Sequence, residues 1–178
     1  MTLRKITTFA ALLLVAACDG NGDPFQVEQV ELRGQYELTQ LSFDPQGVLP
    51  LVELKDRVGT NLPRLVLAQN LRAQLIVTDT LGLTSLANGT YASTHADSVQ
   101  LDFGTNPSIY GRILMSQSMR FFRSEGSASL TFSGSHPEGL ERARLLELVP
   151  EFQGEQLLDP VPGVLTITFT RVGGPQEE

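Results

Sequence analysis

The chain has no tryptophan, a single cysteine and only two histidines. One cysteine cannot form an intramolecular disulfide, nor can it build the multi-cysteine sites that hold zinc or iron–sulfur clusters. His95 and His136 each stand in a turn-like sequence, and a metal site needs three or four convergent ligands. The composition therefore excludes disulfide-rich and cysteine-metal proteins, and we expect neither a metal site nor a cofactor.

Basic residues are scarce, with 13 lysines and arginines against 20 acidic residues and a formal net charge of −7. Removal of residues 1–17, which contain Arg4 and Lys5 but no acidic residue, brings the charge to −9. Nucleic-acid binders need a basic surface to neutralise phosphates. Surface helices that bind anionic lipid depend on lysines, and beyond residue 17 only Lys55 remains. We therefore expect no nucleic-acid partner and no lysine-based membrane attachment.

The N-terminus carries the most specific pattern in the chain. Arg4 and Lys5 form a short positive segment, and residues 9–17 (FAALLLVAA) are apolar. This stretch is much shorter than the ~20 residues that a membrane-spanning helix needs. In residues 15–18 (VAAC) a branched apolar residue and two small residues stand directly before the cysteine. Residues 1–17 are therefore predicted to be a cleaved signal peptide.

The run from Val15 to Cys18 resembles the lipobox of bacterial lipoproteins. The resemblance implies that Cys18 becomes the first mature residue and carries palmitate-type acyl chains. Two or three such chains anchor a protein stably, whereas one is marginal. The expected location is the bacterial cell envelope. Asp19, directly after the cysteine, resembles an inner-membrane retention signal of enterobacterial lipoproteins. That rule does not hold in all bacteria, so the choice between inner and outer membrane stays open. An ordinary secretory signal with an incidental cysteine is the alternative.

The mature chain divides into a tether, one folded domain and a tail. Residues 18–29 contain the acylated cysteine and a stretch rich in Gly, Asp, Asn and Gln, which is typical of a flexible tether. Residues 30–172 have the length of a single domain. Residues 173–178 (GGPQEE) are expected to be a disordered acidic tail.

Apolar and polar residues alternate in short runs throughout the domain, a period typical of half-buried β-strands. The pattern predicts an all-β fold of about eight to ten strands, with a bulge at residues 39–40 and a loop at 55–63. The pattern lacks the alternation of strands and helices that is typical of a parallel sheet. An antiparallel meander that closes into a barrel leaves no edge exposed, and residues 30–43 and 164–172 are the expected partners at the closing seam. An open β-sandwich is the alternative.

Two segments are less clear. Residues 109–114 are interpreted as extended. Residues 138–149 fit either a strand or a helix, and we favour one short helix late in the chain because residues 135–138 resemble a capping box.

A second resemblance covers the domain. Gly34, Tyr36 and Leu38 at alternate positions after a tether, the meander, the late helix and a threonine-rich last strand look like bacterial lipocalin-like lipoproteins. Tyr36 stands where true lipocalins have tryptophan. The resemblance implies a lipocalin-like barrel that binds a small hydrophobic ligand in its interior.

Two functions fit these features. The first is binding of such a ligand, with Arg120 and Arg123 of residues 120–123 (RFFR) as a rim for a carboxylate; alternatively these arginines simply face solvent. The second is a structural or adaptor lipoprotein with a filled core, which docks an envelope protein partner. The chain has no nucleophile elbow and no phosphate-binding glycine loop, so we expect no enzyme activity.

Replacement of Cys18 by serine tests the anchor. Cys18→Ser removes the thiol that acylation requires, so the protein should move from the membrane fraction to the soluble fraction. Fractionation of cells, with a palmitate analogue to label acylated protein, measures both effects. A variant that stays with the membranes would show that the lipoprotein interpretation is wrong.

Overall fold

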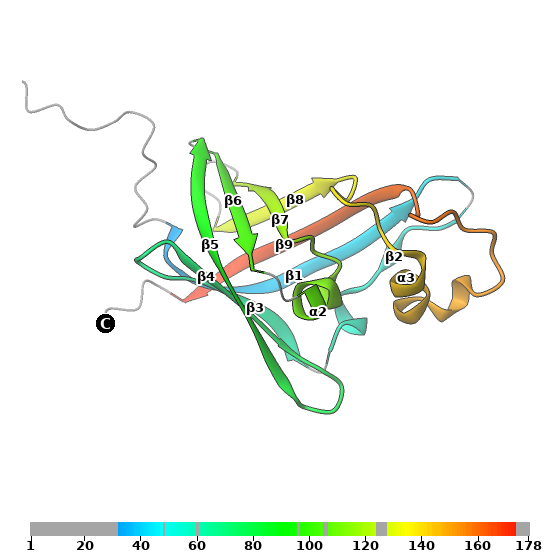
Figure 1. Cartoon of the computed structure of the whole chain (residues 1–178), viewed down its shortest axis with the longest axis horizontal. Helices are drawn as coiled ribbons and strands as arrows, with labels where there is room; N and C mark the ends of the chain where they lie inside the picture. Colours follow the sequence, from blue (N-terminus) through cyan, green and yellow to red (C-terminus); the bar gives the residue numbers. More distant parts are fainter. Residues whose placement is uncertain are drawn as a thin grey trace, which may run out of the picture.

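The computed structural model describes residues 32–47, 49–59, 61–95, 97–104, 107–123 and 128–173. Within these residues a nine-stranded antiparallel sheet runs in the order β2-β1-β3-β4-β5-β6-β7-β8-β9. Its long strands β1 (Gly34–Pro45) and β9 (Gly163–Gly173) also pair with each other. This pairing closes eight strands into a barrel, and β2 (Val52–Glu53) is an extra short strand on β1 (Figure 1). The predicted all-β barrel is confirmed, and the β-sandwich alternative is wrong.

The remaining strands follow one another as a meander. They are β3 (Asn61–Leu67), β4 (Arg72–Thr78), β5 (Thr84–His95), β6 (Ser98–Phe103), β7 (Ser118–Phe122) and β8 (Ser129–Gly134). The loop expected at 55–63 is wrong over its last residues, which begin β3. Pro63 lies where the register of β3 with β4 shifts, a place where a strand tolerates a residue without an amide hydrogen.

The short helices lie between strands. They are η1 (Lys55–Arg57), α2 (Pro107–Tyr110), η2 (Gly111–Ile113), α3 (Arg142–Leu148) and η3 (Pro150–Phe152). The favoured helix within 138–149 is confirmed as α3. The extended segment expected at 109–114 is wrong, because α2 and η2 bury Ile109, Tyr110 and Ile113 at helical spacing.

The seam between β1 and β9 holds the barrel closed. It runs from Gln35 opposite Gly173 to Pro45 opposite Gly163, and its register shifts between Leu38 and Gln40, where the bulge was predicted. On the outer face of β9, hydroxyl groups bond across to both neighbouring strands. These contacts are Thr39–Thr170 and Ser129–Thr170 at 2.9 Å, and Thr131–Thr168 and Ser133–Thr166 at 3.2 Å.

One end of the seam is fixed by an arginine. The guanidinium carbon of Arg171 lies 5.5 Å from the centre of the Tyr36 ring, within cation–π range. A guanidinium nitrogen of Arg171 also donates a hydrogen bond to the backbone oxygen of Arg33. The Tyr36 hydroxyl donates to the Leu32 carbonyl at 2.8 Å, so the chain before β1 is tied to β9.

The barrel interior is filled by side chains. The most deeply buried members of the central layers are Leu38, Leu65, Leu75, Leu101, Phe121, Ile167 and Phe169. The Phe121 ring packs against Phe169 and Phe132, at centre-to-centre distances of 6.0 and 6.3 Å. Burial of such a side chain contributes about 1.5–3 kcal/mol, so this core is the main source of stability.

The chain between β8 and β9 covers the end of the barrel near β2 (Figure 1). Arg57 of η1 forms a two-pronged salt bridge with Glu151 of η3, with both nitrogen–oxygen distances at 2.9 Å. The same guanidinium donates to the Leu148 carbonyl at the end of α3 at 3.0 Å. This arginine therefore joins the segment after β2 to the helices before β9.

The predicted signal peptide (1–17), the tether (18–29) and all of the predicted tail but Gly173 lie outside the described residues; Gly173 is the last residue of β9. No helix in the described ranges is long and apolar enough to span a membrane.

Substitution of a central aromatic tests whether the interior carries the stability. Phe169→Ala should lower the free energy of unfolding by about 3–5 kcal/mol, because it removes buried contacts and leaves a cavity. Val172→Ala on the same strand is the matched control: Val172 is 53% exposed, and its truncation should change stability by less than about 0.5 kcal/mol. Urea unfolding measures both, and equal effects would contradict a filled interior.

Candidate functional site

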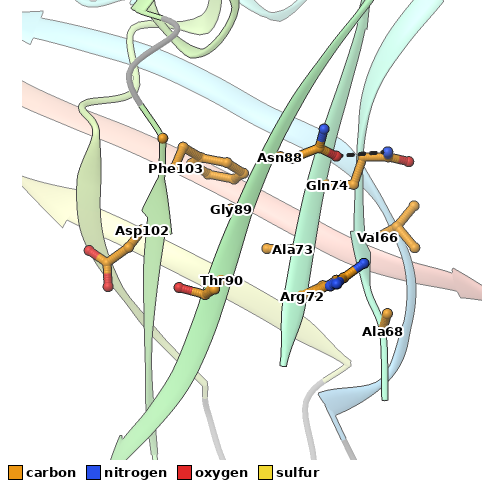
Figure 2. Close-up of a pocket in the computed structure, with 11 residues that line it drawn as sticks. Val66, Ala68, Arg72, Ala73, Gln74, Asn88, Gly89, Thr90, Asp102 and Phe103 are labelled. Atoms are coloured by element: carbon orange, nitrogen blue, oxygen red, sulfur yellow. Dashed lines mark hydrogen bonds between the residues drawn. The ribbon is translucent and has the colours of Figure 1, made fainter. Parts of the chain in front are cut away.

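The main hollow on the described surface is an open groove of about 800 Å³ across the outer faces of β3, β4, β5 and β6 (Figure 2). We call it the outer groove. Its floor is made of small residues, among them Ala68, Ala73, Gly89 and Gly104. A Cβ atom at Gly89 would lie 2.2 Å from the backbone oxygen of Asp102. Glycine is therefore required where β5 and β6 approach each other beneath the groove.

Polar side chains line the groove from neighbouring strands. Gln74 and Asn88 stand directly opposite each other on β4 and β5, and the Gln74 amide donates to the Asn88 side-chain oxygen at 3.1 Å (Figure 2). Arg72 and Asp102 bring charges of opposite sign to the same groove. The Asp102 carboxylate accepts a hydrogen bond from Ser118, whereas Arg72 has no side-chain partner within the described residues. The groove thus offers neutral amides and both charges.

The outer face of the β4–β5 ribbon becomes apolar beyond the groove. Two residues further along the same face, Ile76 stands opposite Leu86. Leu81, Leu83 and Leu86 are 83%, 63% and 48% exposed, and we call this part of the ribbon the leucine hairpin. The hairpin extends past the neighbouring strands, at the lower edge of Figure 1. Exposed leucines beside a polar groove form a surface suited to binding another molecule.

The tip of the leucine hairpin is ordered by one carboxylate. An Asp79 oxygen accepts hydrogen bonds from the backbone N–H groups of Leu81 and Leu83, each at 2.9 Å. The other carboxylate oxygen lies 3.9 Å from the Arg112 guanidinium. Because the turn is held by these contacts, its leucines are presented in a fixed arrangement rather than packed into the core.

The structure does not bring Arg120 and Arg123 together. Arg120 is exposed on the outer face of β7, opposite Gln100. Arg123 follows the strand and is half-buried, and its charge acts on the inward phenol of Tyr36. Residues three apart on an extended chain point to opposite faces. Their role as a ligand rim stays a prediction, as does acylation of Cys18, which lies outside the described residues.

The two histidines lie in different surroundings. His95 is exposed at the end of β5. His136 lines a separate cavity of about 230 Å³ together with Tyr110 and Glu138, and its Nδ1 accepts the Glu138 N–H at 3.3 Å. Burial lowers the pKa of His136, and the Glu138 carboxylate opposes this shift. Within the described residues no three metal-ligating side chains come together.

No protein-family model matches the chain, and no curated protein matches it. The resemblances to lipoproteins and lipocalins are thus carried by the quoted motifs and by the barrel.

The pKa of His136 predicts a pH dependence of stability. Between its lowered folded value and the ordinary 6.5, the unfolded state binds more protons than the folded state. Stability should therefore fall as the pH drops from about 6.5 toward the folded pKa. His136→Gln should flatten this slope, whereas His95→Gln should retain it. Urea unfolding across a pH series measures the slopes, and an unchanged slope in His136→Gln would contradict the assignment.

Proposed function

We propose that this chain is a lipid-anchored protein of the bacterial cell envelope, and that its filled barrel is a scaffold that docks an envelope protein. Acylated Cys18 supplies the attachment, and the outer groove with the leucine hairpin forms the docking surface. The role is binding, without catalysis. A single observation carries the proposal: the barrel interior is packed, while an open groove and exposed leucines adjoin on its outer face.

Packing of the interior supports docking over binding of an interior ligand. A lipocalin-like ligand needs a cavity of roughly 300 Å³ or more inside the barrel. The central layers consist of buried leucine, isoleucine and phenylalanine side chains. The cavities described here lie on the outer face, beside His136 and at one barrel end, away from these layers. An interior ligand is thus supported by the barrel fold alone, whereas docking is supported by the outer groove and the leucine hairpin.

The chemistry of the surface suits a protein better than a bilayer. Apolar anchors beside hydrogen-bonding groups are the usual anatomy of a protein interface. Gln74, Asn88 and Thr90 offer donors and acceptors that match peptide groups. An anionic bilayer would require cations around the leucines, but Asp79 stands at the hairpin tip and the chain carries a net charge of −7.

Photo-crosslinking in intact cells tests the docking surface. A photoreactive residue in place of Leu86 should give one protein crosslink of constant mass. Leu83→Asp should reduce this crosslink by about tenfold or more, because a charge is then buried at the interface. Leu158 lies between η3 and β9, outside the leucine hairpin, and is 68% exposed. Leu158→Asp should therefore leave the crosslink unchanged.

Three results would contradict the docking proposal. The first is a crosslink from position 86 to lipid alone, and the second is an equal loss in both aspartate variants. The third is a fatty-acid adduct in native mass spectrometry of the gently purified protein that persists in Arg33→Gln, which would favour the interior ligand.

A further inference from the structure

We propose that the end of the barrel at which β1 begins holds a binding site for a small oxyanion, a carboxylate or a phosphate group, with Arg33 as its principal ligand. A cavity of about 110 Å³ lies there between Arg33 with the first residues of β1 and residues 66–69 at the end of β3. The cavity shares Val66 and Ala68 with the edge of the outer groove, but Arg33 does not line the groove. The proposed anion site does not depend on docking.

The Arg33 side chain is half-buried, and its Nε is buried without a hydrogen-bond partner. A buried donor without an acceptor is destabilising, because it loses its hydrogen bond to water. Five other basic residues of the described chain lie beside acidic ones. These pairs are Lys55–Asp56, Arg57–Glu151, Arg64–Glu37, Arg112–Asp79 and Arg144–Glu147. Arg33 has no such acidic neighbour among the described residues, and its buried Nε lacks an acceptor.

The Arg33 charge lies at the cavity wall. Its guanidinium acts on the phenol of Tyr91, where it opposes the rise in pKa that burial causes. The Tyr91 hydroxyl donates to the Ala68 carbonyl at 2.8 Å, and Ala68 lines the cavity. The guanidinium is thus placed close to the β3 side of the cavity, where an acceptor would meet it.

Two further arginines lie at the same end. Arg171 packs against Gly34, since a Cβ built on this cavity-lining glycine would lie 3.0 Å from the Arg171 Nε. The φ angle of Gly34, +147°, also favours glycine at this position. Arg123 and Arg171 both lower the pKa of Tyr36, which burial raises above its ordinary value. Arg171 and Arg123 thus add positive charge to the barrel end that holds the Arg33 cavity, and a positive field attracts an anion.

The size and the donors define the ligand. A cavity of about 110 Å³ has room for a carboxylate or phosphate group but not for a sugar or a nucleotide. Guanidinium groups bind both anions through paired N–H donors. The anion has two sources, a free ion or the headgroup of a phospholipid. The chain that leads from Cys18 joins the barrel at Leu32, next to Arg33, so an acylated Cys18 would keep this end near a bilayer.

Calorimetric titration of the full-length protein in neutral detergent with inorganic phosphate and with acetate, at constant ionic strength, tests the free-ion source. Arg33→Gln should weaken binding by about tenfold or more. Arg120→Gln removes an exposed arginine on β7 and should change it less than about twofold. Leu83→Asp should leave it unaltered, which separates this site from the docking surface.

Nanodiscs test the lipid source. If neither ion binds, phosphatidylglycerol added to phosphatidylcholine nanodiscs should raise the melting temperature of the wild type but not of Arg33→Gln. Binding of free phosphate or acetate supports the free ion, and the lipid effect alone supports the headgroup. Absence of both, or equal losses in Arg33→Gln and Arg120→Gln, would overturn the proposal.

A second pair of variants covers the case in which Arg33→Gln does not fold. Ala68→Glu places a carboxylate on the exposed wall opposite Arg33, where it should compete with the anion and abolish binding. Ala68→Gln has nearly the same shape without the charge and should bind as the wild type does. Equal binding by these two variants would also overturn the proposal.

Discussion

The pairing of β1 with β9 is the constraint on which the rest of the structure depends. Without it, the meander would be an open sheet with two unpaired edges. The two strands pair along most of their length, and Arg171 fixes one end by packing on Tyr36 and bonding the chain before β1. Because the ring is then closed, every inward side chain of the eight strands must share one small interior.

That interior also decides where function can lie. Eight strands enclose a space that side chains can just fill, and large residues such as Phe121, Phe169 and Leu101 occupy it here. A filled interior therefore favours the outer faces and the ends as the proposed places for binding. One end is covered by α3 and η3, which Arg57 holds through Glu151 and the Leu148 carbonyl. The other end carries Arg33 and Arg171, and the β4–β5 ribbon extends away from the body.

Much of the barrel could be predicted from sequence because a period of two is local. The seam strands, the bulge at residues 39–40 and the inward positions Leu165, Ile167 and Phe169 all follow from it. The errors arose where a local pattern was ambiguous. The loop expected at 55–63 overlapped β3, which accommodates Pro63 at an irregularity. The run at 109–114 has no period that separates a strand from a buried helix.

The surface features could not be predicted, because they depend on contacts between strands distant in sequence. The outer groove requires Gly89 to lie against Asp102, and alternation does not reveal that approach. The leucine hairpin had one local sign, since Leu81 and Leu83 stand in a turn where polar residues are usual. Adjacency in sequence was misleading for charge, since Arg120 and Arg123 belong to different faces. Arg33 and Arg171, far apart in sequence, lie at the same end because the seam brings the start of β1 to the end of β9. The same closure that fills the core thus gathers positive charge at one end of an acidic protein.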